Sequence, residues 1–245
     1  DRITVYKANM IIPQIADNLT RSGVRDIPSA CPVCQGPTKI QKINDVKSLY
    51  CTNPDCQVKK IKSFTLLVSR DALNIDGLSE ATLEKFISAG FIHSYSDMFH
   101  LDVHREAIVG MEGFGEKSYE NLMGSIERAR HTELYRVIYG LGIAGIGLAN
   151  AKMLCRSFQY DFSKMRSAGM EELTAVDGIG AVLAQAWIDY FRLEKNNLQV
   201  DGLLKELVIE QEEEMAGEAV FEGMTFVITG SVDHFANRKE LQKVI

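Results

Sequence analysis

The feature that most constrains the fold of this chain is a five-residue pattern that occurs four times between residues 75 and 187. Each copy reads apolar, any residue, Gly, apolar, Gly, and apolar residues follow four and seven positions later. The first copy has Ser in place of its second Gly. The copies are Ile75-Asp-Gly-Leu-Ser79, Met111-Glu-Gly-Phe-Gly115, Ile143-Ala-Gly-Ile-Gly147 and Val176-Asp-Gly-Ile-Gly180. A recurrence about every 33 residues indicates a structural repeat of tight turns, each of which begins an amphipathic helix.

The paired glycines predict how each turn is built. Glycine adopts positive φ without steric cost, so we expect both glycines to help the chain reverse between two helices. The second helix then begins at the turn, with unpaired N–H groups and the positive end of its dipole directed outward, which favours an anion. The candidate phosphate-binding residues are Gly77, Ser79, Gly113, Gly115, Gly145, Gly147, Gly178 and Gly180.

The residues that follow the turns differ in charge. Lys117 and Lys152 are well placed to support a bound phosphate, whereas Glu80 and Ala181 are not. We therefore expect the turns at 113–115 and 145–147 to be the strongest phosphate contacts and the turn at 178–180 to come next. The turn at 77–79, which contains Ser79, is the weakest candidate and could serve packing alone.

The distribution of charge limits how an anion could be held. The net charge is −6, but residues 1–70 carry 11 Lys/Arg against 5 Asp/Glu, and residues 71–219 carry 13 against 25. The segment with the repeats is thus acidic. It would have to bind phosphates through backbone N–H groups and a few lysines rather than through a broad basic surface. Lys59, Lys60 and Lys62 either face phosphates or form a solvated surface.

Four of the five cysteines have the spacing of a metal site. Cys31-Pro-Val-Cys34 and Cys51-Thr-Asn-Pro-Asp-Cys56 form two short cysteine turns that are separated by 16 residues. Two such turns can place four thiolates around one tetrahedral Zn²⁺ in a structural site. Two disulfides are the alternative, which the absence of a signal-peptide pattern disfavours. The remaining Cys155 is expected to be a buried core residue.

The rest of the chain suggests several parts. Residues 2–16 are β-branched and partly alternating, so they predict two short strands with a possible turn at Asn9. No proline follows Pro54, and long helical patterns lead to a compact all-α domain. Residues 210–218 are acidic, like a linker, and residues 220–245 read as a buried strand, a turn at Thr229-Gly230 and the start of a helix. No apolar run is long enough to span a membrane. The start at Asp1 suggests a piece of a longer protein.

Other repeat proteins fit less well. Ankyrin and tetratricopeptide units have a similar length, but their sequence signatures are missing. A dinucleotide-binding loop would need a third glycine and a preceding strand, and neither Gly113-Phe-Gly115 nor Gly178-Ile-Gly180 has them. A helical solenoid in which glycines only permit close packing remains open.

The paired-glycine turns resemble the helix–hairpin–helix motif of proteins that hold duplex DNA by its backbone, and the order of all the parts resembles the C-terminal half of bacterial NAD-dependent DNA ligase. This resemblance covers the whole chain. It implies a predominantly α multidomain protein with these parts: strands that end an oligonucleotide-binding (OB) fold at 1–26, a four-cysteine zinc finger at 27–62, a helix–hairpin–helix domain at 63–209, an acidic linker at 210–219 and the start of a BRCT domain at 220–245.

The resemblance also implies a function. The chain would be a monomeric, cytoplasmic bacterial protein that grips nicked double-stranded DNA without reading its sequence, in replication and repair. Zinc would be bound by Cys31, Cys34, Cys51 and Cys56, and Thr229-Gly230 would form the phosphate-binding turn of the BRCT domain. NAD and Mg²⁺ would bind outside this chain. The family's catalytic Lys-x-Asp-Gly motif does not occur here, so we assign no catalytic residue and expect the chain alone to be inactive.

Two other functions remain as alternatives. The chain could be the helix–hairpin–helix subunit of a structure-specific repair nuclease, which would require a metal-binding cluster of carboxylates. It could also be an interaction scaffold without catalytic activity, in which the glycine turns only pack helices together.

Overall fold

The structure is a computed structural model that describes residues 1–9, 11–24, 26–43, 46–210 and 241. The chain divides into two units, Asp1–Ile209 and Glu210–Ile245. The expected BRCT start, with Thr229 and Gly230, lies outside the described residues apart from position 241, as does the expected acidic linker apart from Glu210.

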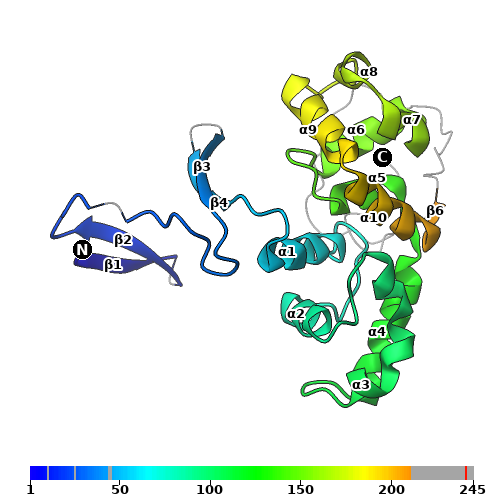
Figure 1. The fold of residues 1–245 in the computed structure, drawn as a ribbon, viewed down its shortest axis with the longest axis horizontal. Coiled ribbons are helices and arrows are strands. Elements are labelled where there is room, and N and C mark those ends of the chain that lie inside the picture. Colours follow the sequence, from blue (N-terminus) through cyan, green and yellow to red (C-terminus); the bar gives the residue numbers. More distant parts are fainter. Residues whose placement is uncertain (10, 25, 44–45, 211–240, 242–245) are drawn as a thin grey trace. The chain divides into compact units, whose positions relative to one another are not determined.

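The first described element is an antiparallel hairpin of β1 (Ile3–Ala8) and β2 (Ile12–Asn18), shown in blue in Figure 1. The chain reverses at Asn9, whose φ of 49° lies in the left-handed region that asparagine tolerates. Two strands and a turn at Asn9 are therefore present as predicted. Their apolar side chains are largely exposed, and a pair of strands does not by itself establish the OB fold that the resemblance implies.

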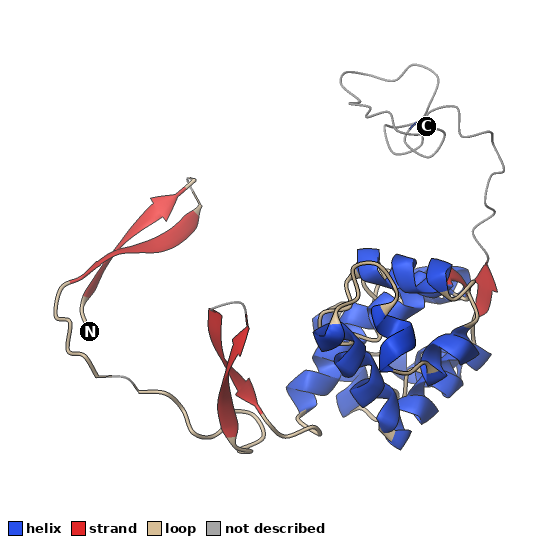
Figure 2. Ribbon diagram, turned by 90° about the horizontal axis from the view of Figure 1, so that it is seen from above, coloured by secondary structure: helices blue, strands red, loops and turns tan. Residues whose placement is uncertain are grey.

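A second antiparallel hairpin lies within the cysteine region. It consists of β3 (Thr38–Ile43) and β4 (Val46–Cys51), in a register that pairs Thr38 with Cys51. The first helix, α1 (Gln57–Leu67), begins directly after Cys56 and extends across the expected domain boundary at 62/63. The cysteine region therefore continues into the helical domain through one helix. Figure 2 shows β1–β2 and β3–β4 as two separate two-stranded ribbons.

Helices make up most of the rest, as Figure 1 shows. The helices before residue 130 are α2 (Glu80–Ser88), the 3-10 helix η1 (Ser96–His104), α3 (Arg105–Val109) and α4 (Glu116–Ala129). The later ones are α5 (Leu134–Gly140), α6 (Leu148–Ser157), α7 (Phe162–Ser167), α8 (Met170–Thr174), α9 (Ala181–Arg192) and α10 (Glu194–Lys205). Helices α9 and α10 are separate and meet at Leu193, whose ψ of 116° is extended.

The core is built from the apolar residues that recur after each turn. All eight predicted positions, four and seven residues beyond the turns, are buried: Leu83, Phe86, Tyr119, Leu122, Ala151, Leu154, Ala184 and Trp187. Burial of a leucine or phenylalanine side chain contributes about 1.5–3 kcal/mol, so these positions fix which face of each helix turns inward. Cys155 is also fully buried, as predicted.

One feature of the helical domain was not predicted. Two short strands, β5 (His131–Glu133) and β6 (Val208–Glu210), pair with each other, and the Val208 N–H donates to the Arg130 carbonyl at 2.7 Å. Arg130 also donates through Nη1 to Glu206 Oε2 at 2.9 Å and through Nη2 to the Phe99 carbonyl at 3.1 Å. Strands of three residues are too short to give an alternating pattern, so the local sequence carries no signal for them.

Candidate nucleic-acid interface and metal centre

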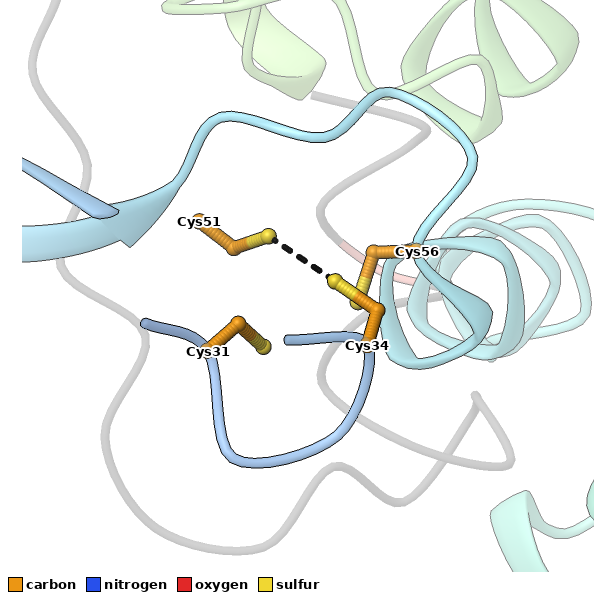
Figure 3. A group of neighbouring side chains, drawn as sticks. All are labelled: Cys31, Cys34, Cys51 and Cys56. Atoms are coloured by element: carbon orange, nitrogen blue, oxygen red, sulfur yellow. Dashed lines mark hydrogen bonds between the residues drawn. The ribbon is translucent and has the colours of Figure 1, made fainter. Parts of the chain in front are cut away.

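The four cysteines of the predicted metal site converge. Their Sγ atoms all lie within 4.8 Å of one another, and Figure 3 shows the four side chains pointing toward a common centre. Cys34 Sγ and Cys51 Sγ are 3.5 Å apart, which is much longer than a disulfide bond, and all the cysteines are free. The structure therefore favours a metal site over the disulfide alternative.

The backbone of the first cysteine turn is shaped around the sulfurs. Gly36 lies so close to the cluster that a Cβ there would be 2.9 Å from Asn53 Cβ and 3.2 Å from Cys34 Sγ. The Cys31 N–H donates to the Gly36 carbonyl at 2.8 Å, and the Gln35 N–H donates to the Cys31 carbonyl at 2.9 Å. The last of the four cysteines, Cys56, is the N-cap of α1.

Hydrogen bonds already favour thiolates at two of these positions. The backbone N–H groups of Cys34 and Val33 lower the pKa of Cys31. The Asn53 side chain, followed by the Gly36 N–H, lowers the pKa of Cys34 to about 6. Burial raises the pKa of Cys51 to about 11. A bound cation would remove the remaining protons, since metal coordination deprotonates thiols, and four thiolates fit a tetrahedral zinc ion.

Each of the four repeats forms a turn between two helices, which we call hairpins 1 to 4. Hairpin 1 (75–79) joins α1 to α2, hairpin 2 (111–115) joins α3 to α4, hairpin 3 (143–147) joins α5 to α6, and hairpin 4 (176–180) joins α8 to α9. The first glycines, Gly77, Gly113, Gly145 and Gly178, all have positive φ, at 94°, 87°, 79° and 76°. This confirms the predicted conformational role of the first glycine, which is to supply positive φ in the turn.

The expectation that the second glycine also supplies positive φ is wrong. Gly115, Gly147 and Gly180 have φ of −170°, −81° and −78°, and each is the N-cap of the following helix. A Cβ at any of the three would meet nothing within 4 Å. Neither backbone conformation nor internal packing therefore requires glycine there. Ser79 occupies the same place in hairpin 1, where its side chain accepts a hydrogen bond from the Thr82 N–H.

The hairpins pack in two reciprocal pairs. In the second pair, a Cβ on Gly145 of hairpin 3 would lie 2.4 Å from Leu183 Cδ2, on the helix that follows hairpin 4. In return, a Cβ on Gly178 of hairpin 4 would lie 2.4 Å from Met153 Cε, on the helix that follows hairpin 3. Each turn is thus covered by the end of a flexible side chain from the other hairpin, and a Cβ on either first glycine would displace that side chain.

The first pair is built in a related way. The Asp76 N–H of hairpin 1 donates to the buried Ser125 Oγ of α4 at 2.8 Å, and Gly77 lies against Leu122 of the same helix. Lys85 of α2 donates through Nζ to the Glu112 carbonyl of hairpin 2 at 2.9 Å. Ser125 gives no local signal in the sequence, because its partner is 49 positions away.

Acidic side chains distinguish the hairpins. Hairpin 1 carries Asp76 within the turn and Glu80 at the first helical position, and hairpin 2 carries Glu112 and Glu116 at the same two places. Hairpin 4 has Asp177 alone, and hairpin 3 has Ala144 and Leu148 and thus neither acid. Glu116 lies directly after Gly115, a carboxylate that the prediction for hairpin 2 did not include. Charge alone therefore favours hairpin 3 over hairpin 2 as an anion site.

The basic side chains near the hairpins differ in their exposure and in the groups that they contact. Lys62 Nζ lies 2.7 Å from Glu80 Oε2, and Arg105 Nη2 lies 2.6 Å from Glu116 Oε2. Lys117 is exposed, two positions after Gly115 of hairpin 2. Lys152 is only partly exposed, and its Nζ lies 4.3 Å from the centroid of the Tyr135 ring, a cation–π contact.

Carboxylates do not gather into a second metal site in the part of the chain that the structure describes. Among those residues, the four cysteines form the one group of His, Cys, Asp or Glu side chains that could hold a metal ion. The cluster that a nuclease would require is thus not found there. Within the same residues, none of the helices is long and apolar enough to cross a lipid bilayer.

Comparison with known proteins gives two findings. A family model described as the helix–hairpin–helix motif matches residues 136–200, which contain hairpins 3 and 4. The whole chain also aligns with curated proteins named DNA ligase. It is 57% identical to that of Lachnoclostridium phytofermentans, 51% identical to that of Ruminiclostridium cellulolyticum and 37% identical to that of Thermosipho africanus. The alignments cover 100% of this chain but only 38%, 37% and 37% of these relatives.

Proposed function

We propose that this chain, which is homologous along its whole length to part of bacterial DNA ligases, is the part of such an enzyme that grips the duplex backbone around a nick. The observation that carries the proposal is the open space at the second glycine of hairpins 2, 3 and 4. A glycine that neither strain nor internal packing requires is explained by the close approach of another molecule to the backbone.

The chemistry of the site favours a phosphodiester backbone as that molecule. Each second glycine caps a helix whose first N–H groups lack partners within the helix, so the surface offers hydrogen-bond donors and a positive dipole end. Because the hairpins pack in reciprocal pairs, each pair presents two such helix N-termini together. Donors that contact phosphates fix the position of a duplex without reading its bases, so binding would be independent of sequence.

We further propose that the converging cysteines bind one structural Zn²⁺. Cys31, Cys34, Cys51 and Cys56 would hold it. The Asn53 side chain, from the second cysteine turn, and the Gly36 N–H would support the sulfur of Cys34. Four thiolates leave no open coordination position, so the ion would contribute to folding rather than to chemistry. Because Cys56 caps α1, the metal site and hairpin 1 would share one helix.

The activity of the parent enzyme follows from the resemblance rather than from a residue of this chain. The parent would use NAD and Mg²⁺, bound outside this chain, to join a 5′-phosphate to a 3′-hydroxyl in replication and repair. This chain would orient the nick for that reaction. We propose that it acts as a monomer in the bacterial cytoplasm, and that its strands β1 and β2 and its residues 220–245 belong to the OB fold and the BRCT domain.

Duplex binding by the 245-residue chain tests the proposal. We expect fluorescence anisotropy to show binding to nicked duplexes of unrelated sequence with similar affinity, and binding should weaken steeply as salt rises. The chain alone should not join strands. Binding only to single strands, or to one base sequence, would refute the proposal, and Mg²⁺-dependent cleavage of branched DNA would favour the nuclease alternative.

Two substitutions separate DNA binding from packing. Gly115→Val and Gly147→Val place a side chain in open space, so both variants should stay folded while their affinity for duplex falls. An interaction scaffold predicts the opposite, a loss of stability without a separate effect on DNA affinity. Thermal unfolding of each variant provides the control.

A further inference from the structure

A depression of about 270 Å³ lies at the junction between the two hairpin pairs. Three segments form its wall. Asn74 comes from the turn just before hairpin 1, Arg128 from the end of α4, and Thr132 and Arg136 from β5 and α5. The depression adjoins hairpin 1, because Ser125, which binds the Asp76 N–H, is one helical turn before Arg128 on α4.

One wall of the depression is held rigidly by Arg136. Its Nη1 donates to the carbonyls of Arg70 at 3.0 Å and Ala72 at 3.2 Å, and its Nε lies 2.8 Å from Glu133 Oε2. These contacts fix the guanidinium plane and leave Nη2 without a partner among the described residues. A side chain held in this way loses little freedom when it binds a further acceptor.

Two further donors in the depression have no acceptor within the described part of the chain. The Arg128 side chain is exposed and makes no ion pair there. Thr132 is only 4% exposed, lines the depression and forms no hydrogen bond through its hydroxyl among the described residues. Hydrogen bonds to charged acceptors are stronger than those to neutral ones, so an anion in the depression would be a favourable partner for this hydroxyl.

The charge of this region differs from that of its surroundings. Residues 71–219 are acidic overall, with 13 Lys/Arg against 25 Asp/Glu, but the depression is lined by two arginines, Arg128 and Arg136, and by one carboxylate, that of Glu133. The carboxylate of Glu133 is engaged by Arg136 and Tyr135. Arginines therefore outnumber carboxylates in this lining, which suits an anion.

We infer that this depression is a phosphate site formed by Arg128, Thr132 and Arg136, and that a phosphate of the duplex backbone occupies it. The inference rests on the proposed DNA-binding function, and it assigns a contact outside the four hairpins. It also gives the first pair a means of holding DNA. Hairpin 1, whose turn and helix start carry Asp76 and Glu80, would be assisted by this neighbouring site.

Two variants of the 245-residue chain test the site. Arg128→Gln removes one phosphate contact and should lower the slope of log affinity against log salt by about 0.9, with binding several-fold weaker. Thr132→Val removes a hydroxyl without changing charge, so it should weaken binding several-fold while the slope stays the same. Arg192→Gln is the matched control, because Arg192 is an exposed arginine of α9, paired with Asp189 at 3.4 Å, and lies outside this depression.

The outcomes separate this site from the proposed function. If the unaltered chain does not bind duplex, the proposed function fails and this inference fails with it. If the unaltered chain binds duplex but Arg128→Gln and Thr132→Val bind as Arg192→Gln does, the site is refuted and the function stands. Titration with inorganic pyrophosphate, followed by the amide NMR signal of Thr132, distinguishes the source of the phosphate. A shift there, together with unchanged DNA binding by both variants, would identify a site for free phosphates and overturn the assignment to DNA.

Discussion

The two glycines of hairpin 3 should respond to the same substitution in opposite ways. Gly145→Ala changes a residue at positive φ that is packed against the chain, and Gly147→Ala changes a residue in open space two positions later. We expect the first variant to lose stability and the second to lose DNA affinity. The comparison is direct because one methyl group is added in each case, within the same turn.

The structure gives the size of the first effect. At Gly145, alanine must adopt φ near 79°, which costs about 1–2 kcal/mol for a residue with a Cβ. The new Cβ would also lie 2.4 Å from Leu183 Cδ2, but this atom is the far end of a flexible, partly exposed side chain that can shift at little cost. The backbone term therefore dominates and lowers the free energy of unfolding by about 1–2 kcal/mol, which lowers the melting temperature by roughly 2–8 °C for a chain of this size.

The second effect is mainly on binding. At Gly147, φ is −81° and the added Cβ meets nothing, so only the weaker N-cap preference of alanine remains, about 0.5–1 kcal/mol. A methyl group between the helix start and a phosphate would prevent one charge-assisted hydrogen bond, worth about 1.5–3 kcal/mol, so affinity should fall about 10- to 100-fold.

Differential scanning fluorimetry and duplex titration of both variants would measure the contrast. Gly147→Ser is a useful companion, because Ser79 shows that serine at this place can cap the helix through the N–H three residues later. It should keep full stability and still bind DNA weakly. The reasoning is refuted if Gly145→Ala melts like the unaltered chain, or if Gly147→Ala binds duplex with unaltered affinity.

Three further predictions concern the parts that hold the domain together. Ser125→Ala removes the buried acceptor of the Asp76 N–H and should lower stability by about 0.5–1.5 kcal/mol in urea unfolding; an unchanged midpoint would contradict the importance of this bond. Burial by itself raises the pKa of Glu206, but hydrogen bonds from Arg130 and His100 outweigh it and hold the pKa below its usual value. The ionised carboxylate therefore stabilises the fold at neutral pH, and this contribution disappears as pH falls through the lowered pKa, so stability measured against pH should decline less on acidification in Glu206→Gln than in the unaltered chain. Metal analysis should find one zinc per chain, and a chelator should reduce the helical circular dichroism signal, because Cys56 caps α1; disulfides in place of zinc would overturn the assignment.

The sequence was most informative where structure depends on residues close together in the chain. The cysteine spacing predicted a cluster whose four sulfurs do converge, and the apolar positions after each turn predicted eight buried side chains. The positive φ of Gly77, Gly113, Gly145 and Gly178 followed from the need of a tight turn for a residue without a Cβ. These are local rules, and a single sequence is sufficient to apply them.

What the sequence did not predict depends on distant contacts. Both glycines of a hairpin look equivalent in the pattern, but their packing differs because Leu183 and Met153 come from the other hairpin of the pair. Three other features also depend on distant contacts: the short pairing of β5 with β6, the hydrogen bond from Asp76 to Ser125 and the position of Thr132 in the depression. Each feature joins segments that are far apart in the sequence, so no local pattern predicts it.

The reciprocal packing of hairpins 3 and 4 also decides how this domain can be divided. A single hairpin transferred to another protein would lose the side chain that covers its turn, because Leu183 and Met153 would each stay behind with the other hairpin. A graft that carries residues 134–192 would keep both turns covered. The pair is therefore the smallest unit in which each of these two turns keeps the side chain that covers it.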